Sequence, residues 1–151
     1  MADAGLSELD RTLIEWRCTR LVNDFYLKSD AGDYQAMAAL FTPDGRFARP
    51  SAPDKPVIGR DALVAQFEAR PAQVRRHLAV NTVITVESAE SATGESYVVL
   101  YTAPAPAEGA TGVPKADPAQ LVGTFHDRFV KLDGEWLFAD RRGSLALTTA
   151  Q

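Results

Sequence analysis

The stretch that decides the fold runs from Gln120 to Leu147 and reads QLVGTFHDRFVKLDGEWLFADRRGSLAL. It contains two β-rich segments, 120–131 and 135–147, in which apolar and polar side chains alternate as they do in half-buried strands. Asp133-Gly134 stands between them and is a strong signal for a two-residue hairpin turn. The sequence therefore predicts a pair of long antiparallel strands.

Two more alternating, β-rich segments precede this hairpin, at 76–87 and 95–103. Residues 104–119 contain four prolines and two glycines and are too irregular for a core element. We expect a long hairpin loop there. Loops of this length are either disordered or functional lids, and the sequence leaves both readings open.

The first half of the chain has helical spacing instead. Ser7 and Asp10 are typical of a helix start, and Gly32 is typical of a helix end, so we predict a helix over about residues 8–29. Its buried side is expected to carry Leu13, Ile14, Cys18, Leu21, Val22 and Phe25.

Shorter elements connect this helix to the strands. We expect a second helix over 33–40 and a third over 61–70, each capped by the aspartate at its start. Between them the sequence predicts a turn at 43–45, a short strand at 46–49 and a proline-rich loop at 50–58. In this order of elements the helices have to cover one face of the sheet.

Composition limits the classes of function. The chain has 151 residues, 46% apolar and 24% charged, so we expect a single domain over 1–151 with an ordered core at about 8–147. The net charge is -4 and basic residues form only short pairs, so nucleic acid is not an expected partner. One cysteine and two histidines are too few for a structural zinc site, and we expect no metal and no cofactor.

The sequence also carries no membrane or export signal that we recognise. Met1–Gly5 is acidic and lacks the basic-then-apolar pattern of a secretory signal. The longest strongly apolar stretch, at 97–103, is too short to span a bilayer. We therefore expect a soluble, cytoplasmic protein that does not bind membranes.

Six short signatures follow one another over about residues 12–143. They are SDAGDY at 29–34, LFTPDG at 40–45, GRDAL at 59–63, His77 with Asn81, DRF at 127–129 and DGEW at 133–136. In this order and spacing the chain resembles the nuclear transport factor 2-like superfamily, in the SnoaL-like branch that includes scytalone dehydratases and the hexachlorocyclohexane dehydrochlorinase. The resemblance implies an α+β, cystatin-like fold. This is a cone-shaped roll in which a strongly curved, mostly antiparallel sheet carries three helices on its concave side and encloses an apolar pocket.

The resemblance also implies a catalytic pair in that pocket, at Asp30 and His77. Taken alone, Asp30 is typical of a polar residue at a helix end, and His77 of a strand residue with a structural hydrogen bond. Together, a carboxylate bonded to one imidazole nitrogen fixes the tautomer and leaves the other nitrogen free as a base. Such a base can remove a proton next to a carbonyl and then protonate a departing hydroxide, as a dehydratase does. Return of the proton to another carbon would instead make an isomerase.

The expected ligand is a small cyclic or aromatic-like organic molecule. Asn81 lies four residues after His77 and so shares its face of an unbroken strand. Some dehydratases of this type have a pocket histidine in the strand that is 97–102 here, but this chain has no histidine there. They often also have a tyrosine at the position where this chain has Arg49. Arg49 could instead pair with an anionic substrate. The expected binding residues are Phe25, Tyr26, Phe47, Arg49, Asn81, Tyr101, Phe125 and Phe129.

The strand that carries His77 has a second, more apolar face. If His77 faces the pocket, this opposite face needs another cover, so we expect a homodimer or homotrimer. A single β-bulge would reverse such assignments of faces. By the same alternation His126 faces away from Phe125 and Asp127. The apolar face consists of Leu78, Val80, Thr82, Ile84 and Val86.

Two functions other than catalysis are open from the sequence. The same pocket could bind a small molecule without chemistry, which the departures from the dehydratase pattern permit. The chain could also be a structural partner like the small subunits of ring-hydroxylating dioxygenases, which resemble this fold. It has no iron-binding set of its own.

Overall fold

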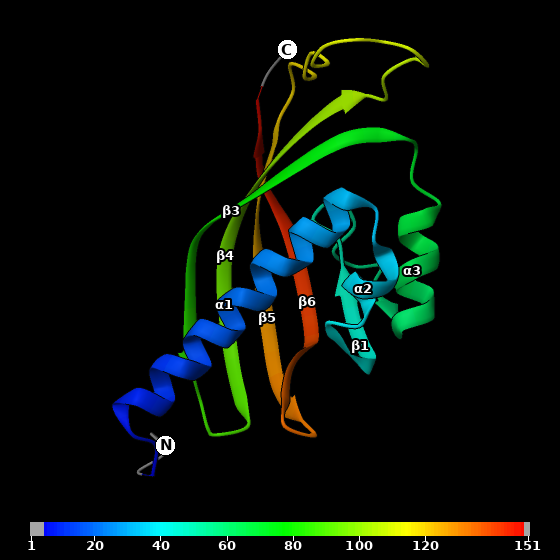
Figure 1. The fold of residues 1–151 in the computed structure, drawn as a ribbon. Coiled ribbons are helices and arrows are strands. Elements are labelled where there is room, and N and C mark those ends of the chain that lie inside the picture. The colour runs from blue at the N-terminus through cyan, green and yellow to red at the C-terminus, as the bar shows by residue number, and fades with distance from the viewer. Residues whose placement is uncertain (1–4, 150–151) are drawn as a thin grey trace.

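The computed structural model describes residues 5–149 and contains, within that range, three helices and six strands. The predicted α+β class is confirmed, and so is the curved, mostly antiparallel sheet (Figure 1). In chain order the elements are α1 (Glu8–Ala31), α2 (Tyr34–Ala38), β1 (Phe41–Ala48), β2 (Val57–Ile58), α3 (Arg60–Glu68), β3 (Gln73–Val86), β4 (Ser91–Pro104), β5 (Leu121–Leu132) and β6 (Glu135–Thr148).

The six strands form one sheet in the order β2-β1-β6-β5-β4-β3. Neighbouring strands run antiparallel except β1 and β6, which are parallel. Figure 1 shows α1 lying across the long strands β3 to β6, while α2 and α3 lie beside β1. The helices and the curved strands therefore enclose the space in which a site can form.

Local signals set both ends of α1. The Ser7 hydroxyl accepts a hydrogen bond from the Asp10 backbone N–H, and the Asp10 carboxylate accepts one from the Ser7 N–H, which is a capping box. Gly32 ends the helix in the left-handed conformation, with φ 76°. Leu13, predicted on the buried side, is instead 46% exposed, because it lies beside the buried stripe rather than on it.

The segment predicted as a turn at 43–45 lies inside β1. This strand begins at Phe41 rather than at residue 46, and its register against β6 shifts between Phe41 and Arg46. A Cβ at Gly45 would lie 2.9 Å from the Phe41 Cβ, so only glycine fits where the strand bends over itself. The turn-forming residues thus produce an irregularity within a strand instead of a reversal of the chain.

β3 contains a β-bulge, so the predicted assignment of its side chains to the two faces is wrong beyond the bulge. Asn81 and Thr82 together oppose Ser96 of β4, and Asn81 has φ 53°, in the left-handed region that asparagine tolerates. As a result His77 and Ile84, an odd number of residues apart, face the same side. Of the predicted apolar face, Leu78 and Val80 are exposed on the outer side, and Thr82, Ile84 and Val86 are turned inward.

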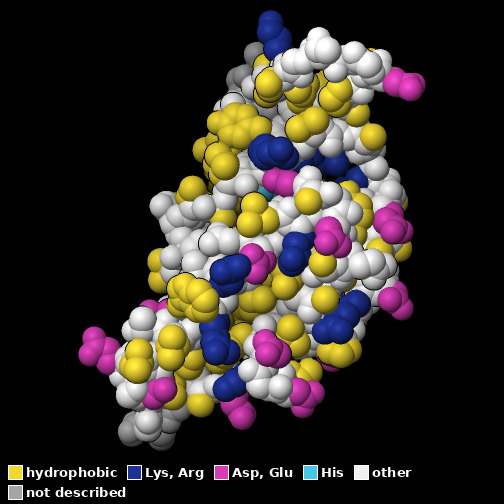
Figure 2. Space-filling model, in the orientation of Figure 1, with side chains coloured by type: hydrophobic (Ala, Val, Ile, Leu, Met, Phe, Trp, Pro, Cys, Tyr) yellow, Lys and Arg dark blue, Asp and Glu magenta, His cyan; other side chains and the backbone are white. Residues whose placement is uncertain are grey.

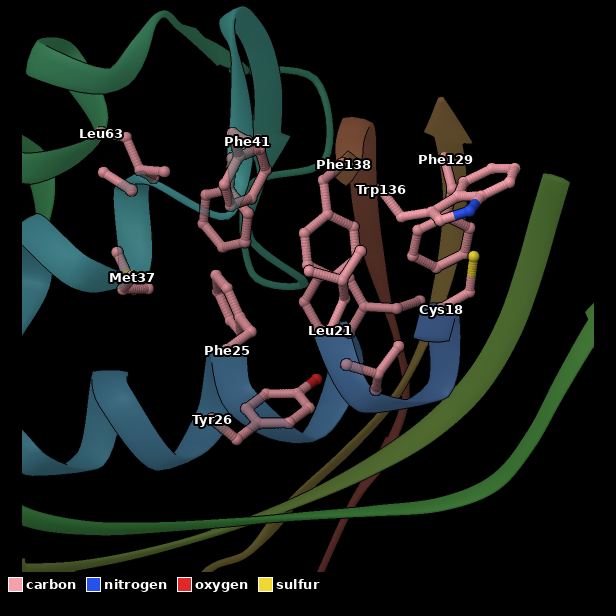
Figure 3. Close-up of a cluster of buried hydrophobic side chains, with 14 of the residues drawn as sticks. Cys18, Leu21, Phe25, Tyr26, Met37, Phe41, Leu63, Phe129, Trp136 and Phe138 are labelled. Atoms are coloured by element: carbon pink, nitrogen blue, oxygen red, sulfur yellow. The ribbon is translucent and has the colours of Figure 1, made fainter. Parts of the chain in front are cut away.

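Aromatic rings dominate the core beneath α1. Figure 3 shows side chains of α1 pointing toward rings from β1, β5 and β6. The Phe25 ring lies at the centre, with its centroid between 5.2 and 6.2 Å from those of five other rings. These neighbours are Tyr26, Phe41, Phe47, Phe67 and Phe138.

The structure bears only partly on the expectations about a secretory signal and a membrane-spanning segment. Residues 1–4, and with them most of the segment expected not to be a secretory signal, lie outside the described residues. Within residues 5–149 no helix is both long enough and apolar enough to cross a membrane.

Candidate functional site

A cavity of about 230 Å³ lies between α1 and the inner face of the sheet. This volume is below the roughly 300–1,000 Å³ of typical pockets for drug-sized ligands, so the cavity suits a smaller molecule. Its walls combine aromatic and aliphatic side chains with a few polar groups. The lining residues are Phe25, Tyr26, Ser29, Phe47, Arg49, Pro50, Ser51, Phe67, Arg70, Pro71, Arg75, His77, Val98, Leu100, Leu121, Gly123, Phe125 and Leu145.

Asp30 and His77 are in direct contact beside this cavity. The His77 Nδ1 lies 2.6 Å from one carboxylate oxygen of Asp30, and the His77 backbone N–H donates to the other oxygen at 2.9 Å. Their side chains are 13% and 10% exposed, for histidine and aspartate respectively. Both oxygens of the carboxylate are therefore engaged by one residue, which holds the two groups in a single geometry.

The architecture explains how two residues 47 positions apart meet. Asp30 lies in the last turn of α1, before the left-handed turn at Gly32. β3 is the edge strand of the sheet, so half of its N–H groups have no partner strand. The Asp30 carboxylate accepts a hydrogen bond from one of these groups, the His77 N–H. This bond joins the end of α1 to the edge of the sheet.

The second ring nitrogen of His77 is available to a ligand. His77 lines the cavity, and within residues 5–149 no hydrogen bond engages its Nε2. With Nδ1–H donating to the Asp30 carboxylate, Nε2 carries the lone pair. The arrangement thus presents a base to the cavity.

Tyr26 connects the pair to a buried polar network. Its ring stacks on the His77 imidazole, with centroids 5.0 Å apart and an interplanar angle of 21°. Its hydroxyl accepts a hydrogen bond from Arg141 Nη2 at 2.8 Å, and Arg141 Nη1 donates to Asp127 at 2.5 Å. Burial raises the pKa of Tyr26 to about 12. The hydroxyl therefore keeps its proton at neutral pH and can donate a hydrogen bond.

Five of the predicted binding residues line the cavity, and three do not. Asn81 is exposed, because the bulge turns it away from the His77 face. Tyr101 pairs in register with Arg76, on the outer side of the sheet. Phe129 is fully buried but packs against Phe138 in the core, with ring centroids 5.1 Å apart. Those in the lining are Phe25, Tyr26, Phe47, Arg49 and Phe125.

The sequence reasoning missed several polar residues of the site. Arg75 could have been found, because it lies two residues before His77 and so shares its face. Arg70 lies inside the predicted third helix at 61–70 but beyond the end of α3 at Glu68, so the helical spacing assumed for it does not apply in the structure. Arg141 stands next to Arg142 in the sequence, which gives no sign of burial, yet it is completely buried.

The described part of the chain contains no cluster of three or more His, Cys, Asp or Glu side chains that could hold a metal ion. The pair at Asp30 and His77 is the acid–base group that this cavity offers.

Comparison with known proteins agrees with the fold. Residues 10–142 match the family model described as the SnoaL-like domain. No curated protein matches the chain.

Solved structures also share the fold. A protein provisionally named a scytalone dehydratase, from Novosphingobium aromaticivorans, has 23% identity and a TM-score of 0.76, covering 96% of this chain and 92% of that one. A type 2 hexachlorocyclohexane dehydrochlorinase (LinA) has 16% identity and a TM-score of 0.76, covering 95% and 92%. A protein of unknown function from Mycobacterium tuberculosis has 29% identity and a TM-score of 0.72, covering 94% and 78%.

Proposed function

The chain belongs to the SnoaL-like domain family, and from that premise we propose that it is a cofactor-free lyase of the dehydratase type. Asp30 and His77 are its catalytic pair. The observation that carries the proposal is the 2.6 Å contact between the Asp30 carboxylate and His77 Nδ1, at a histidine whose Nε2 is open to the cavity. The dehydratase and dehydrochlorinase among the similar structures are consistent with elimination chemistry on this fold.

The first step is removal of a proton. His77 Nε2 takes a proton from a carbon next to a carbonyl, and the electron pair of the broken C–H bond moves toward the carbonyl. The Tyr26 hydroxyl accepts a hydrogen bond from Arg141 and donates its own O–H to the carbonyl oxygen. Asp30 stabilises the imidazolium that forms.

The second step is loss of water. The imidazolium returns its proton to a hydroxyl group on the adjacent carbon, the C–O bond breaks, and a C=C bond forms. The reaction needs no oxidant and no cofactor. If the proton returns to a different carbon instead, the same groups perform an isomerisation.

The aromatic rings of the cavity hold the body of the ligand. Phe25, Phe47 and Phe125 line it, and tight packing among them favours a small cyclic or aromatic-like molecule. Exclusion of water by these rings strengthens the electrostatic interactions of the pair.

The test is a screen of small cyclic β-hydroxy carbonyl compounds for loss of water. His77→Gln and Asp30→Asn are expected to reduce the rate by about 10²–10⁴-fold, the usual contribution of a general base. His126→Gln is the matched control, since His126 is exposed on the outer side of the sheet, 3.4 Å from Glu95. An unchanged rate in His77→Gln would exclude the mechanism.

The same screen separates catalysis from binding alone. A ligand that raises the melting temperature of both the unmodified protein and His77→Gln, with no turnover in either, would identify a non-catalytic binding module.

A further inference from the structure

We propose that the cavity recognises its ligand through a carboxylate, bound by Arg49, Arg70 and Arg75. The inference rests on the proposed function only in taking this cavity as the ligand site. It adds the substrate class, which is a small aromatic or alicyclic carboxylate whose rings lie against the phenylalanines of the cavity.

Three arginines of the cavity lining have no counter-ion among the described residues, and two of them, Arg49 and Arg75, act electrostatically on the third, Arg70. All three line the cavity, and within residues 5–149 none of them forms an ion pair. Arg75 Nη2 binds only neutral acceptors, the Pro71 carbonyl at 2.9 Å and the Gln73 side-chain oxygen at 3.0 Å. The gathering of positive charge is a local feature, because the chain as a whole has a net charge of -4.

Asp30 is the one carboxylate among the groups that act electrostatically on Arg70, and it is already engaged. Both of its oxygens bind His77. The carboxylate that acts on Arg70 is therefore committed to the imidazole and does not pair with the arginines.

Arg70 is held as a fixed part of the cavity. Its guanidinium lies 3.6 Å from the centroid of the Phe67 ring, which packs against Phe47. Burial lowers the pKa of Arg70 to about 10, and the neighbouring charges of Arg75 and Arg49 act in the same direction. The group stays protonated at neutral pH, so the protein holds like charges together at an energetic cost.

A bound carboxylate would remove this cost. Guanidinium groups match a carboxylate with two parallel hydrogen bonds, and such charge-assisted bonds are stronger than neutral ones. Figure 2 shows Lys and Arg side chains gathered beside the C-terminal part of α1, below the loop that follows β4. The cavity volume of about 230 Å³ leaves room for one or two rings beside the acid group.

Binding of matched acids and amides tests the proposal without any need for turnover. Benzoate, cinnamate and 2-naphthoate are each compared with the corresponding amide, which has nearly the same shape but no charge, by calorimetry and thermal shift. At least one acid is expected to bind about tenfold or more tightly than its amide. In Arg49→Gln and Arg70→Gln this preference is expected to fall about tenfold.

The control is Arg17→Gln, an exposed arginine of α1 outside the cavity, which is expected to keep the preference. Arg49 is exposed, so Arg49→Gln keeps the test valid even if Arg70→Gln fails to fold. The proposal is overturned if acids and amides bind equally, if the preference survives in both variants, or if no compound of either series binds. Equal binding would leave the proposed lyase intact, whereas a carboxylate preference together with no loss of water from any β-hydroxy carbonyl compound of the screen above would overturn only the lyase.

Discussion

Arg141 is the largest side chain that the described residues bury completely. Its guanidinium donates to Asp127 and Tyr26 and lies between 4.3 and 5.1 Å from the centroids of four aromatic rings. Buried ion pairs contribute little net stability, but losing one partner leaves an uncompensated charge. We infer that the pair is there to position Tyr26, which stacks on His77.

The pH dependence of stability tests the environment of Asp127. Burial raises its pKa to about 6 although Arg141 opposes the shift, and one of its oxygens has no hydrogen-bond partner. Because the folded state binds this proton more tightly than the unfolded state, the contribution of Asp127 to stability is greatest below about pH 4 and decreases as the pH rises through about 6. The free energy of unfolding of the unmodified protein, relative to Asp127→Asn, should follow that course.

Urea unfolding at a series of pH values measures this difference. Asp133→Asn, an exposed substitution in the hairpin turn, controls for the loss of one acidic charge. If the free energy of unfolding of the unmodified protein increases relative to that of Asp127→Asn between pH 4 and pH 6, the expected sign is wrong.

At the scale of elements, the bulge in β3 decides which side chains of that strand face α1. It lets His77 face α1 while Ile84, beyond the bulge, packs on the same side. Asn81 supplies the left-handed backbone at φ 53° that the bulge requires. One residue at an exposed strand position thus sets how the two halves of β3 face α1.

Substitutions at Asn81 are expected to separate backbone conformation from side-chain contacts. Asn81→Val should lower the free energy of unfolding by about 1–2 kcal/mol, because a β-branched residue is strained in the left-handed region. Asn81→Gly should have little effect, since glycine adopts this conformation freely. Thr85→Val is the control at an exposed position of the same strand. Equal losses for Asn81→Val and Asn81→Gly would show that the side chain, not the conformation, matters.

At the scale of the whole molecule, the outer side of the sheet carries exposed apolar residues. Leu78, Val80 and Val83 of β3 lie there, and Tyr97 of β4 is the register partner of Val80. Apolar residues gathered on one face commonly mark an interface between subunits. We therefore propose a homodimer or homotrimer that covers this face.

Light scattering coupled to size-exclusion chromatography measures the assembly. The unmodified protein is expected to have the mass of a dimer or trimer, and Val83→Lys to shift it toward the monomer because a charge would be buried at the interface. Leu27→Lys, at an exposed leucine of α1, is expected to keep the assembly. A monomer for the unmodified protein would refute this interface.

The sequence by itself determined the features that depend on neighbouring residues. Ser7 and Gly32 bound the first helix, and Asp133-Gly134 forms the hairpin turn with φ 51° and 86°. Such caps and turns are chosen by interactions within a few residues, so a short segment carries all the information. The juxtaposition of Asp30 and His77 was expected from the resemblance alone, since no local pattern connects a helix end to a strand edge.

Only the tertiary structure decided which polar side chains meet. The bulge at Asn81 depends on the register of two strands, so alternation along one strand could not reveal it. Arg141 is buried because its partners arrive from 14 and 115 residues away. The same holds for the arginine cluster, which β3 and two connecting segments bring to one cavity. Burial of a charge depends on the groups packed around it, and these come from distant parts of the chain.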